Sequence, residues 1–416
     1  MSPLVKRHLR PIVSQLLSAF PAVDLRGARQ VGKSTLADLV GDASKRPLVR
    51  RTLDDAEVRQ LAENDPRGFV SQVPNGLLVI DEVQRVPELA LALKASIDAD
   101  RRPGRFLVTG SVDWLKQRSL DSLAGRLVST QVFGFSQGEL AGRRDDFVLA
   151  IANDQLNTTP SSQYARSDYV DLLARGSMPE AVRLEQRPRA IWLESYLERL
   201  LSRDLTELTR LSDPLRIRGL LTALAATQGS ETVIARLGNR ANLPASTTAD
   251  YVDLLRALFL VERIPPWTAN LLKREVGRSK YLVTDSALAM MLTRTTPTVL
   301  NDIVRGGAIG GLLESFVAAE LLRQRGWAGI RFDVFHYRSP DGREIDLVCH
   351  LEDDRIIAIE VKAAQSVTSS DYRNLVWLRE QLGDRMLAGV VLTLDTHTRR
   401  LDDRIWAAPV SVLWEL

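Results

Sequence analysis

The chain has 416 residues, of which 45% are apolar and 26% are charged, and its 55 basic residues nearly balance its 52 acidic ones. This length exceeds one compact core, so two or three domains are expected, and a net charge of +3 neither requires nor excludes nucleic acid as a partner. The single cysteine, Cys349, excludes an internal disulfide framework, and only four histidines disfavour a histidine metal site or a Ser-His-Asp hydrolase.

The apolar residues are spread along the chain. The stretch from Met1 to Phe20 is basic and amphipathic but has no continuous apolar segment, and no later run approaches the length of a membrane span. We therefore expect a cytoplasmic protein without membrane contact.

The first motif is a phosphate-binding loop. The segment GARQVGKST fits the pattern G-x-x-x-x-G-K-S/T, and it lies between an apolar strand at Ala22 to Leu25 and a helical segment at Leu36 to Val40. Only eight of the 55 basic residues are lysines, so a lysine at this position is unlike the chain's general use of arginine. Lys33 would reach the β and γ phosphates, and the Ser34 hydroxyl would hold Mg²⁺. The loop predicts binding of a nucleoside triphosphate by Gly27, Ala28, Arg29, Gln30, Val31, Gly32, Lys33, Ser34 and Thr35.

An apolar strand downstream ends in two acids. Leu77 to Ile80 is followed by Asp81 and Glu82 about fifty residues after the loop, a spacing typical of nucleotide hydrolases. Asp81 would belong to the Mg²⁺ shell, and Glu82 would orient and polarise the attacking water. A small-molecule kinase has less need of the second carboxylate, so we regard that alternative as the weakest.

Two further segments can contribute to this site. The strand from Arg105 to Ser111 ends in small polar residues, and Thr109 or Ser111 could reach the γ-phosphate or its water; a plain turn is the alternative. Arg126 precedes the apolar segment Leu127 to Phe133, and it could stabilise transition-state charge in its own chain, in a neighbouring chain, or not at all.

The motifs GARQVGKST, LLVIDEVQ, FLVTGS and SLAGR together resemble the AAA+ class of prokaryotic ATP-binding proteins with a C-terminal domain of unknown function. The resemblance implies an α/β fold with a doubly wound parallel sheet. It also implies ATP as the nucleotide, and a homo-oligomer in which an arginine of one subunit acts at the next subunit's ATP.

The middle of the chain reads as helical. After a polar segment, Ala152 to Ser167, helical periodicity continues to Leu211, and three short helices follow at residues 217–227, 232–237 and 246–258. This spacing resembles a winged helix-turn-helix. Because Asp250 and Asp253 on the third helix would meet DNA phosphates unfavourably, we favour a structural or protein-contacting role over DNA reading.

A second constellation lies near the C-terminus. Glu344 to Val348 and Ile356 to Lys362 form two predicted strands of a hairpin, which brings Asp346 toward the neighbouring Glu360 and Lys362. Two carboxylates can bind Mg²⁺ while a lysine positions a water for attack on phosphate.

This D…E-x-K arrangement resembles the restriction-endonuclease, or PD-(D/E)xK, fold. The resemblance is supported by a predicted helix at Leu312 to Gln324, a strand at Arg331 to Tyr337, a helix at Tyr372 to Gln381 and a strand at Ala388 to Leu394. In nucleases of this fold, a glutamate at the place of Glu314 often completes the metal site.

Two functional hypotheses follow. In the first, residues 1–150 are an AAA+ ATPase, residues 165–300 a helical region with a winged helix, and residues 305–416 a Mg²⁺-dependent nuclease acting on DNA or another nucleic acid. In the second, the same ATPase controls a nuclease-like domain that is inactive and only binds DNA or a partner protein. The two hypotheses differ at Asp346, Glu360 and Lys362.

Overall fold

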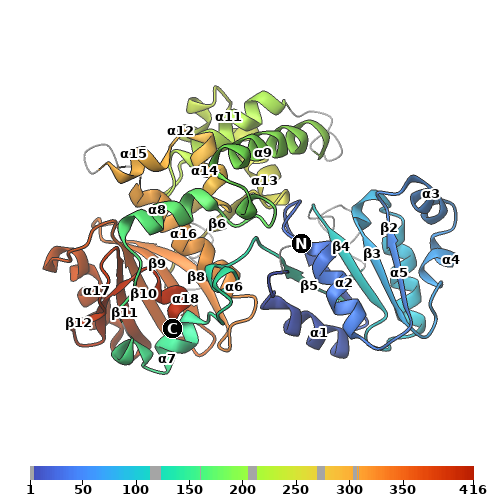
Figure 1. Cartoon of the computed structure of the whole chain (residues 1–416), viewed down its shortest axis with the longest axis horizontal. Coiled ribbons are helices and arrows are strands. Elements are labelled where there is room, and N and C mark those ends of the chain that lie inside the picture. The colour runs from blue at the N-terminus through green and yellow to red at the C-terminus, as the bar shows by residue number, and fades with distance from the viewer. Residues whose placement is uncertain are drawn as a thin grey trace. The chain divides into compact units, whose positions relative to one another are not determined.

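The structure is a computed structural model that describes residues 4–112, 123–159, 161–204, 213–268, 277–302, 307 and 309–416. The chain divides into two compact units, the first comprising residues 1–135 with 257–259 and the second residues 136–256 with 260–416. It is an α/β protein with one parallel sheet, a helical middle and a mixed C-terminal sheet (Figure 1). Across the described ranges, no helix is both long and apolar enough to cross a membrane.

The first unit contains a five-stranded parallel sheet in the order β2-β3-β4-β1-β5. Because the strands are parallel, their carboxyl ends meet at one edge, where the segments after β1, β4 and β3 lie next to one another. The elements are α1 (Leu9–Ala19), β1 (Ala22–Arg26), α2 (Lys33–Ala43), β2 (Leu48–Thr52), α3 (Ala56–Asn64), α4 (Pro66–Val70), β3 (Leu77–Asp81), the 3-10 turn η1 (Val83–Arg85), α5 (Leu89–Ala99), β4 (Phe106–Gly110) and β5 (Leu127–Gln131).

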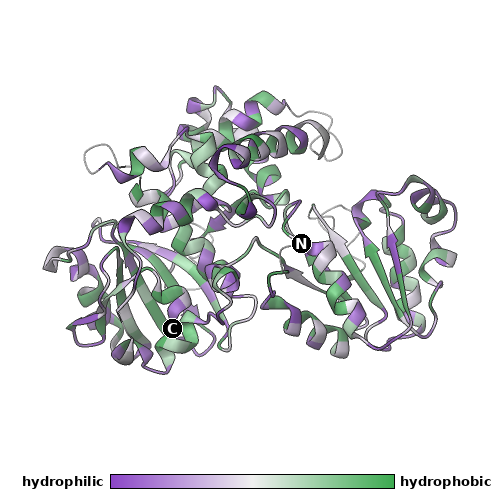
Figure 2. Cartoon of the chain, in the orientation of Figure 1, coloured by the Kyte–Doolittle hydropathy of each residue, from purple (hydrophilic) through white to green (hydrophobic). Residues whose placement is uncertain are grey.

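Helices cover both faces of this sheet. On one face, Leu78 and Ile80 of β3 belong to a buried cluster with Leu93 of α5. On the other, Val79 lies close to Gly41 of α2, where an added β-carbon would be 3.7 Å from the valine methyl. Figure 2 shows the central strands β3 and β4 as largely hydrophobic. The alternation along β3 therefore buries both faces, as in a doubly wound sheet.

The second unit begins with short helices and a helical middle region. The polar segment Ala152 to Ser167 contains one 3-10 turn, η4 (Gln155–Thr158), while Pro160 and residues 205–211 of the predicted helical stretch lie outside the described part. The elements are α6 (Gln137–Ala141), α7 (Phe147–Ala152), α8 (Arg166–Arg175), α9 (Gln186–Arg199), α11 (Pro214–Ala225), α12 (Ile234–Arg240), α13 (Ala245–Ala257), β6 (Val261–Ile264), β7 (Lys280–Val283), α14 (Ser286–Leu292) and α15 (Pro297–Asn301).

The three predicted helices of the middle region are present as α11, α12 and α13, and the antiparallel pair β6–β7 follows them. Ser246, Thr247 and Thr248 lie at the start of α13, where hydroxyl residues commonly cap a helix. Thr248 is instead fully buried, and its hydroxyl donates to the Pro244 carbonyl at 2.8 Å. Asp250 and Asp253 are exposed on this helix, and Asp253 pairs with Arg256 at 2.9 Å.

The C-terminal part of the second unit is a six-stranded mixed sheet in the order β12-β13-β11-β10-β9-β8. Strand β10 runs parallel to β11 and antiparallel to β9, so the predicted hairpin lies inside the sheet. Leu375 and Leu378 of α17 pack against the sheet. The elements are α16 (Ile309–Gln324), β8 (Phe332–Arg338), β9 (Glu344–Leu351), β10 (Ile356–Val361), α17 (Ser369–Leu382), β11 (Met386–Thr393), β12 (Arg399–Asp402), β13 (Ile405–Pro409) and α18 (Val412–Glu415).

Cys349, the single cysteine, lies in β9 and is fully buried. Burial raises the pKa of its thiol, which keeps the sulfur protonated.

Candidate functional sites

The phosphate-binding loop connects β1 to α2 and depends on two glycines. Gly32, with φ of 91°, is the last residue before α2, and Gln30 also has a positive φ of 65°. A β-carbon at Gly27 would lie 2.1 Å from the Val132 carbonyl oxygen, so only glycine allows the loop to pass this close to the end of β5. The loop ends at the N-terminus of α2, a position suited to phosphate binding.

Lys33 is buried at the first position of α2 and is 4% exposed. Its Nζ donates to the carbonyl oxygens of Gly27 and Ala28, both at 2.9 Å, so the ammonium lies inside the loop. Burial lowers the pKa of Lys33 to about 8, although the nearby carboxylates of Glu82 and Asp81 oppose this shift. These interactions place Lys33 where incoming phosphates would exchange with backbone carbonyls.

Asp81 links the loop to the two strands beside it. Its Oδ1 accepts a hydrogen bond from the Ser34 hydroxyl at 2.8 Å and another from the Thr109 hydroxyl of β4. Burial raises the pKa of Asp81, with the two hydroxyl donors opposing it. The predicted Mg²⁺ ligands Ser34 and Asp81 are therefore adjacent, and their oxygen atoms suit a hard divalent cation.

Glu82 follows β3 in a left-handed conformation, with φ of 58° and ψ of 48°. Its backbone N–H donates to Thr109 Oγ1 at 3.2 Å, and its carboxylate accepts from the Ser111 hydroxyl at 2.7 Å. Gln84 donates to both Glu82 and Ser111. A positive φ at a non-glycine residue costs energy and is often found at functional sites.

Two contributors to this site are not among the predicted site residues. Gln84 is the last residue of the motif LLVIDEVQ, but nothing in the motif assigns it a contact with Glu82 or Ser111. Arg7 is buried and donates to the carbonyls of Val31 at 3.0 Å and Phe133 at 2.7 Å, which fixes the phosphate loop from outside. Its place near the N-terminus, far from the loop in sequence, hides this role.

Arg126 is at the opposite edge of the sheet from Lys33. It directly precedes β5, whose first residue pairs with the first residue of β1, and it forms an ion pair with Asp98 near the end of α5, at 2.7 Å. The length of β1 separates the two edges by about 13 Å. This position is unfavourable for action on the chain's own phosphates, and it leaves a role in a neighbouring chain and no role as the alternatives.

The C-terminal candidate site forms where β9 is irregular. Phe335 pairs with Val348 and Tyr337 with Ile345, so β9 has one more residue than β8 across this interval. Such a bulge redirects side chains. Asp346 lies in this bulge and directly precedes Leu347 in the chain. Leu347 pairs with Ile359 of the antiparallel strand β10, so Asp346 lies on the side of Glu360, the residue after Ile359.

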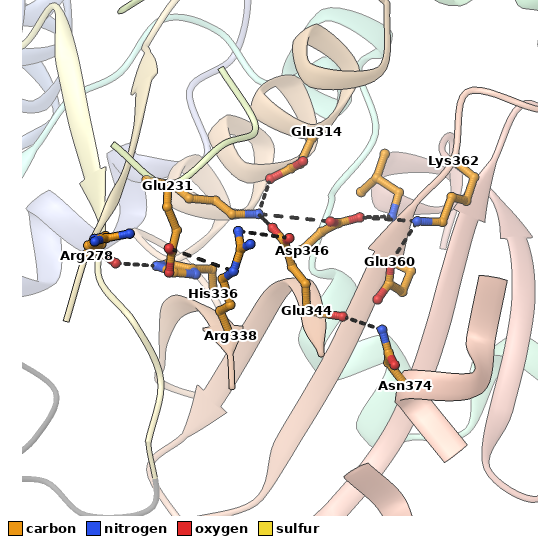
Figure 3. Close-up of polar contacts among 12 residues, drawn as sticks. Glu231, Arg278, Glu314, His336, Arg338, Glu344, Asp346, Glu360, Lys362 and Asn374 are labelled. Carbon is orange, nitrogen blue, oxygen red and sulfur yellow. Dashed lines mark hydrogen bonds and ion pairs between the residues drawn. The ribbon is translucent and has the colours of Figure 1, made fainter. Parts of the chain in front are cut away.

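The predicted triad residues are close together, as Figure 3 shows. Lys362 Nζ is 2.8 Å from Glu360 Oε2 and 4.0 Å from Asp346 Oδ2. Asp346 Oδ2 also accepts from the backbone N–H of Val361 at 2.8 Å. Glu314, from α16, points into the same cluster.

A second lysine, Lys280 of β7, occupies the cluster and was not predicted. It is 3% exposed, and its Nζ is 2.8 Å from Glu314 Oε1, 3.0 Å from Glu344 Oε1 and 4.0 Å from Asp346 Oδ1. The one available signal was its rarity, because Lys280 is one of only eight lysines. Its partners lie in distant elements, so no local pattern reveals the contact.

The charges in this cluster shift one another's pKa values. Burial and the neighbouring Asp346 raise the pKa values of Glu314 and Glu360 to about 8, although Lys280 and Lys362 respectively oppose the shifts. Burial would lower the pKa of Lys280, but Glu314, Asp346 and Glu344 together raise it. Burial and Lys280 lower the pKa of the adjacent His336 to about 4, so this imidazole is neutral at pH 7.

The glutamates predicted to bind metal form ion pairs with lysines. Glu314 pairs with Lys280, and Glu360 pairs with Lys362. Among the residues that the structure describes, no group of three or more His, Cys, Asp or Glu side chains is arranged to hold a metal ion. As they stand, Glu314, Asp346 and Glu360 do not fit a resident Mg²⁺.

Three family descriptions match parts of the chain. Residues 19–141 match the AAA domain, residues 166–299 a Domain of unknown function (DUF8612), and residues 309–413 a Domain of unknown function (DUF4143). The segment with the phosphate-binding loop is thus similar to the AAA domain, and the two later regions are similar to families without assigned function.

Similar proteins extend over nearly the whole chain. Uncharacterized proteins of Mycobacterium tuberculosis and Mycobacterium bovis are each 27% identical over 411 residues, covering 98% of this chain and 84% of theirs. A Walker-type ATPase of Pyrococcus abyssi is similar at 14% identity and a TM-score of 0.39, covering 70% of this chain and 96% of its own. The RuvB Holliday junction branch migration motor of Thermotoga maritima reaches 18% identity and a TM-score of 0.31, covering 62% and 89%. At these TM-scores, the two structures indicate nothing about what this chain acts on.

Proposed function

We propose that this chain hydrolyses ATP and uses the cycle to control its C-terminal domain. The observation that carries the proposal is the 2.8 Å hydrogen bond between Ser34 and Asp81, which joins the phosphate loop to the strand that ends in Glu82. A loop without a hydrolytic partner would not need this pair of acids beside it.

The chain's residues divide the work of hydrolysis. Backbone N–H groups of the loop and the ammonium of Lys33 bind the β and γ phosphates, and Ser34 with Asp81 holds Mg²⁺. Bound Mg²⁺ supplies neutralisation of phosphate charge. Glu82 accepts a proton from the attacking water. In the nucleotide-free chain its carboxylate accepts from Ser111 and Gln84, so these two residues position it and compete for it.

Two substitutions test this site. Lys33→Ala should abolish ATP binding, whereas Glu82→Gln should bind ATP normally and lose turnover, because the amide cannot accept a proton. Lys6→Ala, at an exposed lysine of the same unit, should leave both unchanged. Binding is measured by calorimetry with ATP and turnover by phosphate release. Undiminished hydrolysis by Lys33→Ala or Glu82→Gln would contradict the assignment.

We propose further that the second unit acts on nucleic acid through a nuclease-like domain at residues 305–416. The arrangement of Asp346, Glu360 and Lys362 supports this proposal, with α16 and α17 flanking a mixed sheet. Between cleaving and binding, the ion pairs of Glu314 and Glu360 favour binding, because both carboxylates already have cationic partners. In this proposal the domain binds DNA or a partner protein and does not cleave it.

The middle region, residues 165–300, is proposed to contain a winged helix in α11, α12, α13 and β6–β7. Exposed Asp250 and Asp253 on α13 support a structural or protein-contacting role for it. The AAA domain, proposed to extend over residues 1–150, would then change the state of the two later domains when ATP binds or is hydrolysed.

One assay separates cleavage from binding. The protein is incubated with labelled single- and double-stranded DNA and RNA, with Mg²⁺ or Mn²⁺, and with or without ATP. We expect the protein to bind nucleic acid with an affinity that falls as the salt concentration rises, and we expect no cleavage. Cleavage that is lost in both Asp346→Ala and Lys362→Ala would instead establish the nuclease. If no salt-dependent binding occurs, a partner protein replaces nucleic acid.

A further inference from the structure

The ammonium group of Lys280 lies among carboxylates that come from different elements. Glu314 belongs to α16, whereas Glu344 and Asp346 belong to β9. Two of the three carboxylates are within hydrogen-bonding distance of Lys280 Nζ, at 2.8 and 3.0 Å, and the third is at 4.0 Å. Lys280 itself is 3% exposed. A buried ammonium is stable only where anionic partners compensate its lost hydration.

The charges of the cluster divide into two groups around Asp346. Lys280 is 4.0 Å from its Oδ1, and Lys362 is 4.0 Å from its Oδ2. The Lys362 group is the more open one, because the Lys362 side chain is 32% exposed against 4% for Lys280. Lys280 is therefore the inner cation of the cluster, and it is the one that contacts Glu314.

The backbone around Lys280 holds it in place. Lys280 pairs with Ile264 across β6–β7 and forms a bridge with Glu231. The turn at Gly229, two residues before Glu231, packs closely against α16, because a β-carbon at Gly229 would lie 2.7 Å from Glu314 Oε2. The cation thus comes from the middle region, while its anions come from the C-terminal domain.

We propose that the Lys280 ammonium takes the place of a divalent cation in this nuclease-like site, so that the site needs no metal to balance the charge of its carboxylates. Mg²⁺ and Ca²⁺ bind carboxylate oxygens at about 2.0–2.6 Å. From their present distances of 2.8, 3.0 and 4.0 Å, the oxygens of Glu314 and Glu344 would need to move inward by about 1 Å or less, and that of Asp346 by about 1.4–2 Å, to hold a metal.

A neutral side chain at position 280 would leave only Lys362 and Arg338, which is 3.5 Å from Glu344, as cations beside the four carboxylates, and it would create a metal site. The inference rests on the proposed nuclease-like character of the domain and not on the ATPase.

The test compares Mn²⁺ binding by full-length variants, measured by calorimetry without nucleotide. All variants carry Asp81→Ala so that the ATP site lacks the carboxylate proposed to bind metal there. With Lys280 present, we expect no binding that depends on Asp346. Lys280→Met should gain a Mn²⁺ site at least about tenfold tighter than any in its parent, equivalent to about 1.4 kcal/mol, and Mn²⁺ should raise its melting temperature.

Two controls make the result specific. Lys362→Met removes the outer ammonium but leaves Lys280, so it should gain no site. Lys280→Met combined with Asp346→Ala should lose the site that Lys280→Met gained. A folded Lys280→Met protein without new Mn²⁺ binding would overturn the proposal.

If Lys280→Met does not fold, the chain with Lys280 still decides the question. Mn²⁺ binding by that chain, abolished by Asp346→Ala, would mean that metal and Lys280 coexist, which the proposal forbids. ATP turnover of Lys280→Met with Asp81 intact is measured separately. A loss of ATP turnover in this variant would show an effect of Lys280 on the ATPase. It would say nothing about metal binding, which is measured without nucleotide.

Discussion

At the residue scale, the ammonium of Lys33 couples ATP binding to protons. Its pKa is lowered by burial to about 8, so the nucleotide-free chain loses this charge as pH rises through 8. Bound phosphates favour the charged form, and binding above pH 8 must therefore include uptake of a proton. Between pH 8 and the unfolded value of 10.5, the native chain binds fewer protons than the unfolded one, so this group alone makes the free energy of unfolding rise with pH there.

We expect ATP affinity to be constant near pH 7 and to fall above pH 8, approaching about tenfold per pH unit. Calorimetry at pH 9 in two buffers with different ionisation enthalpies measures the proton uptake directly. Equal affinity at pH 7 and pH 9.5, with no buffer dependence, would show that Lys33 keeps its charge without nucleotide.

Gly27 has no room for a single added carbon. Gly27→Ala places a methyl 2.1 Å from the Val132 carbonyl oxygen, a backbone atom that cannot swing away. We expect a loss of about 2–3 kcal/mol in stability and much weaker ATP binding. Calorimetry would follow the unfolding transition that ATP shifts.

The matched control for Gly27→Ala is the same change at Gly219, a helical glycine of α11 with no atom within 4 Å of an added β-carbon. Gly219→Ala should be neutral or stabilising by up to about 1 kcal/mol, because alanine favours a helix. Equal effects of the two substitutions would contradict the close packing of the loop on Val132.

How far single residues could be predicted depends on whether their partners are local. The loop, Asp81 and Glu82 follow fixed spacings around a strand and a helix, so the sequence indicates them directly. Arg7 and Lys280 reach their partners from other elements, and Arg126 lies at the far edge because β5 runs parallel to β1. Such placements depend on the fold and leave no local pattern.

At the element scale, the N-terminus of α14 ties two parts of the helical middle together. Asp285, 2% exposed, accepts from the Leu288 N–H at 2.9 Å and from both the N–H and the hydroxyl of Ser177, at 2.7 and 2.8 Å. Asp285→Ala would leave three buried donors without this acceptor. We expect a loss of about 2–4 kcal/mol in the unfolding transition that ATP does not shift.

Asp213→Ala serves as the control for Asp285→Ala. Asp213 caps α11 through the N–H groups of Leu215 and Arg216, but its side chain is 47% exposed. Water can replace it, so its removal should cost about 1 kcal/mol. A cost at Asp285 no larger than at Asp213 would mean that the Ser177 contacts contribute little.

Elements themselves were easier to predict than their irregularities. Helices α11, α13, α16 and α17 and strands β3, β4 and β10 lie within a few residues of the expected ranges. The bulge in β9 was not expected, because the alternation of Glu344 to Val348 reads as a regular strand. The burial of Thr248 has no local signal for a similar reason, because hydroxyl residues at a helix start resemble a cap and only packing decides which of them faces inward.

At the scale of the whole molecule, the two edges of the parallel sheet carry different parts of the proposed reaction. Lys33, Asp81 and Glu82 lie at the carboxyl edge, while Arg126 precedes β5 at the other edge. An arginine at that edge can reach a phosphate only in a neighbouring copy of the chain. The proposed catalytic role of Arg126 therefore requires that two copies of the chain meet.

Complementation between two inactive variants tests this arrangement. Arg126→Ala should reduce turnover on the order of 10³-fold if its guanidinium stabilises transition-state charge. A Glu82→Gln chain still supplies Arg126, and an Arg126→Ala chain still has an intact ATP site, so an equal mixture should recover about a quarter of wild-type turnover if copies assemble at random in a closed ring. Adding Arg126→Ala to the Glu82→Gln chain should prevent recovery.

The substitution Asp98→Ala separates a catalytic role of Arg126 from a structural one. It removes the ion pair between Arg126 and Asp98 but keeps the guanidinium of Arg126. If Arg126 only stabilises its own fold, Asp98→Ala and Arg126→Ala should lose turnover equally, and mixing should restore nothing. If Arg126 acts on a neighbour, Asp98→Ala should retain turnover, since releasing the guanidinium from Asp98 leaves its charge available. Turnover per chain should then also rise with protein concentration, because the complete site exists only where two copies meet.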